Sequence, residues 1–208
     1  MVYSGHPRWG FLVYRTSYTD DAAWQRYLHI LHRSTWISLN NEHQTRLYPY
    51  ASFTPMEDRV FEGASKDTIR EQFQSWVLNR SVERDGPGAN LIQLVPRYRI
   101  CMYADKEILD NTSIEDITTF STPFAAIEGR AVLIDTEFGQ HYTYAGRGDE
   151  QHEPVDGKTT WGVDWMYVYL EFTSIAYNRL CGGSEEWNRI EPSIIGRRAV
   201  RGVVCSLW

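Results

Sequence analysis

Residues with acid–base and anion-binding side chains recur at every second position of the segment 97–105 (RYRICMYAD). Because successive side chains of a β-strand point to opposite faces, the odd-numbered residues of this segment share one face. They include Arg99, Cys101, Tyr103 and Asp105. Tyrosine and carboxylate side chains can move protons, and arginine can hold an anion. We therefore predict Tyr103 and Asp105 as catalytic residues, with Arg99 and Cys101 as ligand-binding residues.

A second aromatic strand is predicted within 161–172, which contains DWMYVYLEF. Its alternation places Met166, Val168 and Leu170 on the side that would pack against helices. The opposite side carries Trp165, Tyr167, Tyr169 and Glu171. Aromatic rings with a few charged groups among them are typical of a pocket for a small apolar or aromatic molecule. We predict Trp165, Tyr167 and Glu171 as ligand-binding residues.

The opening strand adds to the same face, in one of two orientations. It contributes either Tyr14 and Thr16, or Phe11, Val13 and Arg15. We predict Tyr14 as a ligand-binding residue and Arg15 as a catalytic residue. Arg15 can also form an ion pair with Asp105 across the sheet, and this structural role is favoured over a clamp for an anionic ligand.

Other reactive residues give weaker signals. Arg99 is a same-face neighbour of Cys101, and a neighbouring arginine can lower a thiol pKa, although a buried, inert cysteine is the default expectation. His29 and His32 have a spacing that can bind one metal, but no third ligand lies near them in the sequence. No Walker, dinucleotide-binding or G-x-S-x-G motif occurs, so we expect no metal and no cofactor.

The segment 9–31 must position much of this face. Its first half, rich in aromatic and β-branched residues, predicts a strand. Its second half predicts a helix, which Thr19 or Asp20 can cap. The spacing of Trp24, Tyr27, Leu28 and Leu31 predicts that they form one buried stripe along this helix.

A second helix is predicted after Ser65, which can cap it, with Asp67 in its first turn. Its buried stripe consists of Ile69, Phe73, Trp76 and Val77. Shorter elements follow the same reasoning: an edge strand within 52–60, where Pro55 occurs, a strand at 130–137, and a short helix at 174–180.

These elements predict an α+β fold. Few strand–helix–strand repeats and no glycine-rich phosphate loop argue against a doubly wound sheet. A ferredoxin-like antiparallel sheet with helices on one face fits best. The aromatic face opposite the helices would be too apolar to leave in water, so a ligand, a second subunit or the C-terminal segment must cover it.

We expect a single domain spanning 1–208. The segment 139–160 is polar and lacks apolar periodicity, which predicts a long mobile loop. Its histidines, His141 and His152, lie among acidic residues and are expected to be solvated. The segment 185–208 is expected to pack on the domain or to extend the sheet, with 200–207 as an edge strand.

Composition limits the partners. The net charge of −6 argues against nucleic acid, because a nucleic-acid-binding surface must be basic. Three cysteines cannot all pair within the chain, and no apolar leader follows Met1. These features predict reduced thiols, no membrane segment and a cytoplasmic location.

Several segments resemble a widespread family of small uncharacterised proteins of filamentous fungi. They are 9–28, 56–77, 85–105 and 162–172, so the resemblance extends to about residue 172. The matching positions are Gly10, Phe11, Val13, Tyr14, Arg15, Asp21, Trp24, Asp58, Arg59, Gly63, Arg70, Phe73, Trp76, Pro96, Arg97, Tyr98, Cys101, Tyr103, Asp105, Trp165 and Met166. The resemblance implies an intracellular fungal protein. It implies no reaction, because no activity is assigned to that family.

Two functions from different classes explain the aromatic face. The first is a small enzyme or ligand-binding protein for an apolar or aromatic molecule, of the cofactor-free kind found in secondary-metabolite biosynthesis. The second is a structural or interaction protein whose aromatic face is a homodimer interface, since tyrosine, tryptophan, methionine and arginine are enriched at interfaces. RNA stacking on the sheet aromatics conflicts with the acidic charge.

Overall fold

Five strands form one mixed β-sheet in the order β2-β1-β3-β6-β9. The computed structural model describes residues 8–87, 89, 95–114, 127–137, 151–155, 158–160, 164–183 and 186–187. The sheet strands are β1 (Leu12–Arg15), β2 (Thr54–Met56), β3 (Ile100–Ala104), β6 (Arg130–Asp135) and β9 (Trp165–Tyr169). Two separate pairs are β4 (Ser113–Ile114) with β5 (Ile127–Glu128), and β7 (Gln151–Val155) with β8 (Lys158–Thr160).

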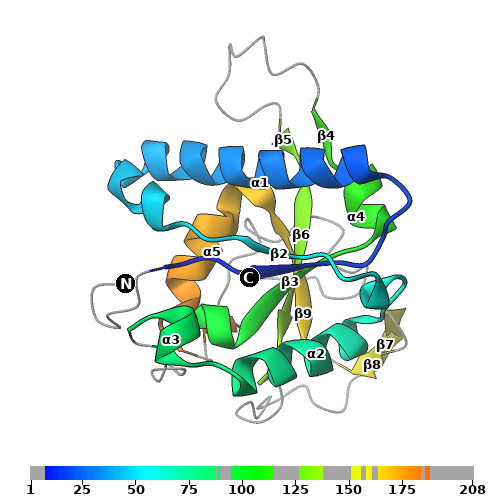
Figure 1. The fold of residues 1–208 in the computed structure, drawn as a ribbon. Coiled ribbons are helices and arrows are strands. Elements are labelled where there is room, and N and C mark those ends of the chain that lie inside the picture. Colours follow the sequence, from blue (N-terminus) through cyan, green and yellow to red (C-terminus); the bar gives the residue numbers. More distant parts are fainter. Residues whose placement is uncertain are drawn as a thin grey trace.

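Helices alternate with strands in the first half of the chain (Figure 1). The α-helices are α1 (Asp21–Asn41), α2 (Lys66–Leu78), α3 (Val82–Asp85), α4 (Lys106–Asp110) and α5 (Thr173–Leu180). Short 3₁₀ turns are η1 (Thr45–Tyr50), η2 (Arg59–Phe61), η4 (Pro96–Tyr98) and η5 (Leu170–Phe172). The fold is α+β, as predicted, in one domain.

The sheet is not antiparallel, so the ferredoxin-like arrangement is not confirmed. β1 is parallel to both of its neighbours, β2 and β3, whereas β6 is antiparallel to β3 and β9. Parallel neighbours require long crossover connections. The chain provides them, because α1 lies between β1 and β2 and α2 lies between β2 and β3 in the sequence.

Helices pack on both faces of the sheet, contrary to the prediction of one covered face. On one face, the ring of Tyr14 lies 5.2 Å from that of Phe61 and 6.5 Å from that of Phe73 in α2. On the other, the ring of Phe11 lies 5.1 Å from that of Tyr177 in α5. Figure 1 shows β1 between α1 above and α2 below. All four residues of β1 are buried, as is typical of a parallel strand covered on both sides.

Both long helices begin at their predicted caps. The side chain of Asp20 accepts a hydrogen bond from the Ala23 amide at 2.9 Å, and that of Ser65 accepts one from the Thr68 amide at 3.2 Å. These bonds satisfy amides that have no partner within the helix. The buried stripes form as predicted, apart from Leu28 and Trp76, which are only partly buried. The predicted edge strand is confirmed as β2, at one end of the sheet.

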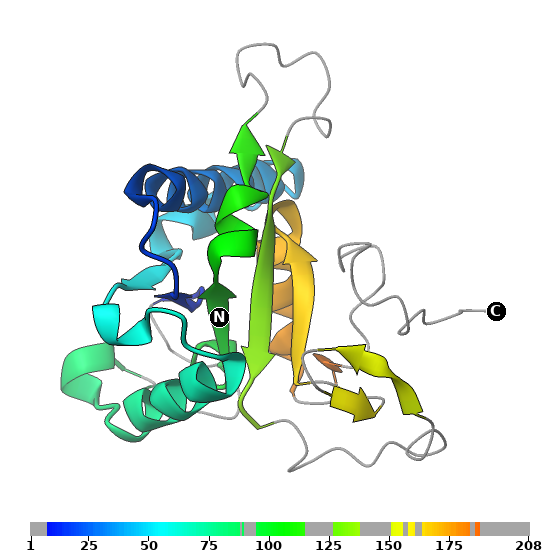
Figure 2. The ribbon, with the colours of Figure 1, turned by 90° about the vertical axis from the view of Figure 1, so that its right-hand side faces the viewer.

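The prediction of a loop over 139–160 is wrong in part. β7 and β8 pair as an antiparallel ribbon, seen beside the lower end of β9 in Figure 2. The remainder of that segment, including His141, lies outside the described residues. So does the predicted edge strand at 200–207, together with all of 185–208 except residues 186 and 187.

The junction between β1 and β2 depends on Arg97 and Gly10. The buried guanidinium of Arg97 donates to the Ser52 carbonyl at 2.7 Å and to the Thr54 hydroxyl at 2.7 Å. Gly10 has φ +113°, and a Cβ at this position would lie 2.8 Å from the Ser52 oxygen. Only glycine therefore allows the two chain segments to approach this closely.

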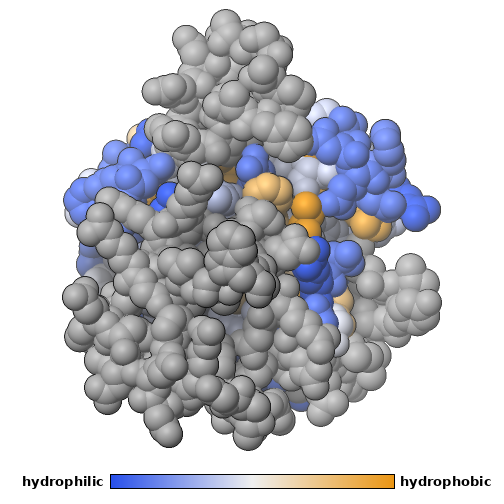
Figure 3. Space-filling view, turned by 180° about the vertical axis from the view of Figure 1, so that it is seen from behind, coloured by the Kyte–Doolittle hydropathy of each residue, from blue (hydrophilic) through white to orange (hydrophobic). Residues whose placement is uncertain are grey.

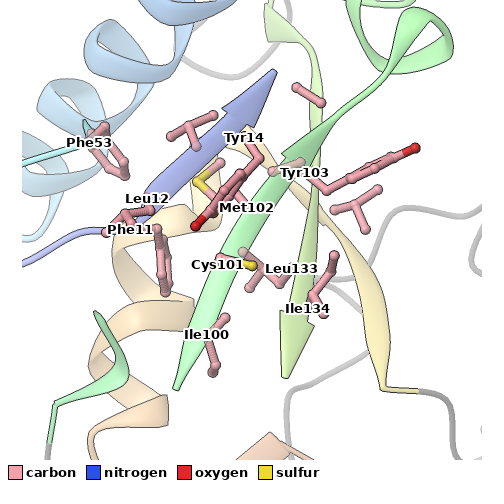
Figure 4. Packing of buried hydrophobic residues seen from close by; sticks show 14 of the residues in the cluster. Phe11, Leu12, Tyr14, Phe53, Ile100, Cys101, Met102, Tyr103, Leu133 and Ile134 are labelled. Carbon is pink, nitrogen blue, oxygen red and sulfur yellow. The ribbon is translucent and has the colours of Figure 1, made fainter. Parts of the chain in front are cut away.

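A central cluster of buried hydrophobic side chains joins both faces of the sheet to its helices. Figure 4 shows Cys101 and Met102 on β3 beside Ile134 and Leu133, their register partners on the neighbouring β6. Seen from behind, the described surface is mainly hydrophilic, with a small hydrophobic group among the hydrophilic residues (Figure 3). Among the described residues, none of the helices has the length and apolar character needed to cross a bilayer.

Candidate functional site

A cleft of about 290 Å³ lies where the carboxyl end of β3 meets the first residues of α2 and β9. Three of its lining residues were predicted as site residues: Tyr103, Asp105 and Trp165. The others are Ser65, Lys66, Asp67 and Asp164. The carboxyl ends of parallel strands are where ligands bind in open α/β sheets, because the loops that leave the strands diverge there.

Strand register determines which side chains reach the cleft. Tyr103 is paired through Val132 with Tyr167, and Cys101 is paired through Ile134 with Trp165. Side chains at paired positions lie on the same face, so Tyr103 and Trp165 point to one side of the sheet.

Lys66 connects the two aromatic residues. Its Nζ atom lies 5.2 Å from the ring centroid of Tyr103 and 4.7 Å from that of Trp165. At these distances an ammonium group is attracted by the negative faces of both rings. The lysine is the first residue of α2, so the cap at Ser65 also fixes its position. We name this group of three residues the Tyr103–Trp165 site.

Acidic residues border the site and share one arginine. Arg70, one turn into α2, forms an ion pair with Asp164 and another with Asp67, in which the N–O distance is 2.6 Å. The side chain of Asp164 is 6% exposed, whereas that of Asp67 is 65% exposed. The buried carboxylate therefore has a structural counter-ion, and the exposed one lies at the mouth of the cleft.

The two predicted catalytic residues in the cleft also stabilise the fold. The hydroxyl of Tyr103 donates to the Ala64 carbonyl at 3.1 Å, which joins β3 to the turn before α2. The Oδ1 atom of Asp105 accepts a hydrogen bond from the Ile108 amide at 2.9 Å and caps α4. These bonds orient both side chains, but they also engage the tyrosine proton and one carboxylate oxygen.

Arg15, the third predicted catalytic residue, lies on the other face of the sheet. Its Nε donates to the Ser17 carbonyl at 2.8 Å, and its Nη2 pairs with Asp21 at 2.5 Å. Glu57 lies 3.8 Å from its Nη1, and the Tyr18 ring covers the guanidinium at 4.4 Å. These partners replace the predicted pair with Asp105. Arg15 is four per cent exposed and connects β1 to the start of α1.

Tyr14 and Cys101 are on the predicted face but within the core. Tyr14 is 1% exposed, and burial raises its pKa well above the ordinary value for tyrosine. Burial likewise raises the pKa of the Cys101 thiol, and the charge of Arg70 only partly opposes this effect. A thiol in this state is a packing group and a poor nucleophile.

Arg99 and Glu171 lie away from the cleft. Arg99 precedes β3 and is four residues from Tyr103, a separation of about 13 Å along a strand. It pairs with the buried Asp135 at 3.7 Å. Glu171 follows the carboxyl end of β9, and burial raises its pKa. Tyr167 is nearer, with its ring 5.5 Å from that of Trp165.

Four residues of the cleft were not predicted as site residues: Ser65, Lys66, Asp67 and Asp164. Lys66 and Asp164 lie just outside regular alternation, at the first residue of a helix and at the residue before a strand. A parallel arrangement of β1 and β3 would have indicated Lys66, because the helix of a crossover connection begins near the carboxyl edge of the sheet. Nothing in the sequence near Asp164 indicated its pairing with Arg70.

Within the described part of the chain, no group of three histidine, cysteine or acidic side chains is close enough to hold a metal ion. His29 is exposed and His32 is half-buried against the ring of Phe53, 5.5 Å away. Comparisons with protein-family models, with curated proteins and with solved structures found no match. The resemblance to small fungal proteins therefore stays a prediction.

Proposed function

We propose that this protein binds a small aromatic molecule in the cleft of the Tyr103–Trp165 site. The observation that carries the proposal is the joint position of Lys66, Tyr103 and Trp165, an ammonium group over two aromatic rings at the wall of a cleft. Two rings give a flat ligand apolar contact, and a charged group fixes its orientation.

The size of the cleft limits the ligand. A volume of about 290 Å³ is just below the usual range for small-molecule sites. It suits a compound with one aromatic ring and a few polar substituents. Lys66 can donate to an acceptor on the ligand, and Asp67 can accept from a donor. A neutral phenol or aromatic amide satisfies both.

The geometry favours binding over catalysis. Tyr103 and Asp105 are the residues of the cleft that were predicted for proton transfer, but each also forms a hydrogen bond with the backbone. An acid–base step by these two side chains would therefore use groups that already have hydrogen-bond partners. We therefore propose that Tyr103 and Asp105 orient the ligand. We also propose that the protein is located in the cytoplasm.

A homodimer is the second candidate. Tyr167 and Tyr169 are half-buried on β9, which is the last strand of the described sheet. Tyrosines in this state are frequent at interfaces, where the ring is buried and the hydroxyl makes a polar contact. This reading uses the same face of the sheet with no chemistry.

The test is saturation-transfer NMR with 4-hydroxybenzamide on wild type, Lys66→Met and Lys106→Met. Methionine keeps the length of the lysine stem and removes the charge. We expect binding by the wild type, a loss of roughly fivefold or more in affinity in Lys66→Met, and no change in Lys106→Met, whose lysine lies outside the cleft. Equal binding by all three proteins would disprove the proposed site.

The mass of the native protein distinguishes the ligand-binding proposal from the homodimer. Native mass spectrometry of the wild type and of Tyr167→Ser measures subunit number and retained ligand together. Under the binding proposal, Tyr167→Ser leaves the subunit number unchanged. Conversion of a dimer to a monomer by this substitution would favour the interface.

A further inference from the structure

α1 carries a second stripe of side chains, separate from its buried one. At helical spacing along the helix lie His29, His32, Arg33, Trp36, Ile37 and Asn40. They line an open groove of about 600 Å³. Tyr48 of η1 lies at the other side of this groove.

Contacts with buried aromatic residues position both elements that form the groove. Trp9 donates its indole N–H to the Leu47 carbonyl at 2.8 Å, which holds η1 against the sheet beside Tyr48. His32 lies edge-on to Phe53, with ring centroids 5.5 Å apart. Trp36, in contrast, is 46% exposed although its side chain is the largest of any residue type. An exposed tryptophan opposite a held tyrosine provides two aromatic surfaces for a ligand.

The described lining of the groove differs in charge from the chain as a whole. The described residues that line it include one arginine and two histidines but no carboxylate. The chain as a whole has a net charge of −6. A basic, aromatic-walled groove on an acidic protein concentrates small anions and favours those that can also stack.

We propose that this groove binds a small aromatic carboxylate, with its ring against Trp36 and Tyr48 and its carboxylate against Arg33 and the two histidines. Guanidinium and carboxylate form paired, charge-assisted hydrogen bonds, which supply the specificity for an anion. The groove is formed by α1 and η1, and none of its residues lines the Tyr103–Trp165 site. The two proposals therefore stand independently.

Binding in the groove should strengthen as the pH falls from about 8 to about 5.5. The titratable and charged residues that line the groove with His32 are His29 and Arg33 on α1 and Tyr48 on η1. Phe53, which contacts the His32 ring, is uncharged. Burial, and then the nearby His29, lowers the pKa of His32 below its ordinary value. Because its pKa is lowered, His32 is neutral near neutral pH and gains its proton as the solution becomes more acidic, which adds positive charge to the groove.

The experiment is isothermal titration calorimetry with 2-naphthoate. We expect a Kd of the order of 1 mM, from the usual affinity per ligand atom. Arg33→Gln should weaken binding at least about fivefold, whereas Arg46→Gln, an exposed arginine of η1 that does not line the groove, should leave it unchanged. Trp36→Ala should weaken binding without changing the circular dichroism spectrum.

The neutral analogue 2-naphthamide separates charge from stacking. We expect it to bind more weakly than 2-naphthoate and to be insensitive to Arg33→Gln. Equal affinity of the two compounds, or unchanged naphthoate binding in both Arg33→Gln and Trp36→Ala, would overturn the proposal. So would loss of a dimer in Trp36→Ala, measured by sedimentation, because the groove would then be an interface between two copies of the chain.

Discussion

Tyr14 and Tyr103 are register partners on the parallel strands β1 and β3, yet only one of them reaches a cleft. Their hydroxyl ends point apart in Figure 4. Tyr14 is enclosed by the rings of Phe61 and Phe73, whereas the Tyr103 hydroxyl is held by the Ala64 carbonyl. The two tyrosines thus have different roles. Tyr14 is covered by the middle of α2, whereas Tyr103 lies beside the first residues of that helix.

Gly10→Ala should destabilise the protein by about 2 kcal/mol or more. Its φ is +113°, and the added Cβ would approach the Ser52 oxygen to 2.8 Å. Gly63→Ala is the matched control, because Gly63 also has a positive φ, of +67°, but has no atom within 4 Å of the added Cβ. We expect it to cost roughly 1 kcal/mol. Urea denaturation measures both, and equal losses would contradict the role of the close approach.

Arg97→Met should lower the free energy of unfolding by about 3 kcal/mol. The substitution leaves the Ser52 carbonyl and the Thr54 hydroxyl without their buried donor. Arg46→Met, at an exposed arginine, should change stability by less than about 0.5 kcal/mol. If chemical denaturation gave the same midpoint for both variants, the Arg97 contacts would contribute no stability.

Cys101 should resist iodoacetamide in the folded protein at about pH 8, because burial raises its pKa and keeps it a thiol. Cys181 is less buried and should be modified first, even though burial raises its pKa as well. Peptide mass spectrometry after labelling, with and without guanidinium chloride, compares the two sites. Rapid native labelling of Cys101 would show that the thiol is accessible and would restore it as a nucleophile.

Local signals predicted the elements of this fold well. Caps at Asp20 and Ser65 fix where α1 and α2 begin, since each side chain satisfies a free amide within three residues. Alternation placed Tyr103 and Trp165 on one face, and the register confirms it. These features depend on neighbours in the sequence, which is why the sequence reveals them.

Local sequence signals could not predict whether β1 is parallel or antiparallel to its neighbours, nor which face of the sheet carries Arg15. β1 is buried on both faces, so its residues show no polar side that would orient Arg15. In the structure, Arg15 lies on the face of the sheet opposite to that of Tyr103, where it forms an ion pair with Asp21. The position of Lys66 over Trp165 likewise depends on residues far apart in the chain, and no local pattern records such a contact.

The pairing of β1 also has a kinetic consequence. Leu12 pairs with Thr54 on one side and Val13 pairs with Met102 on the other, so both partners of β1 are distant in the sequence. Such long-range contacts slow folding, because the loop between them must close first. Trp165 is made later still during synthesis from the N-terminus. A ligand of the Tyr103–Trp165 site would therefore recognise only chains in which β9 has joined the described part of the sheet.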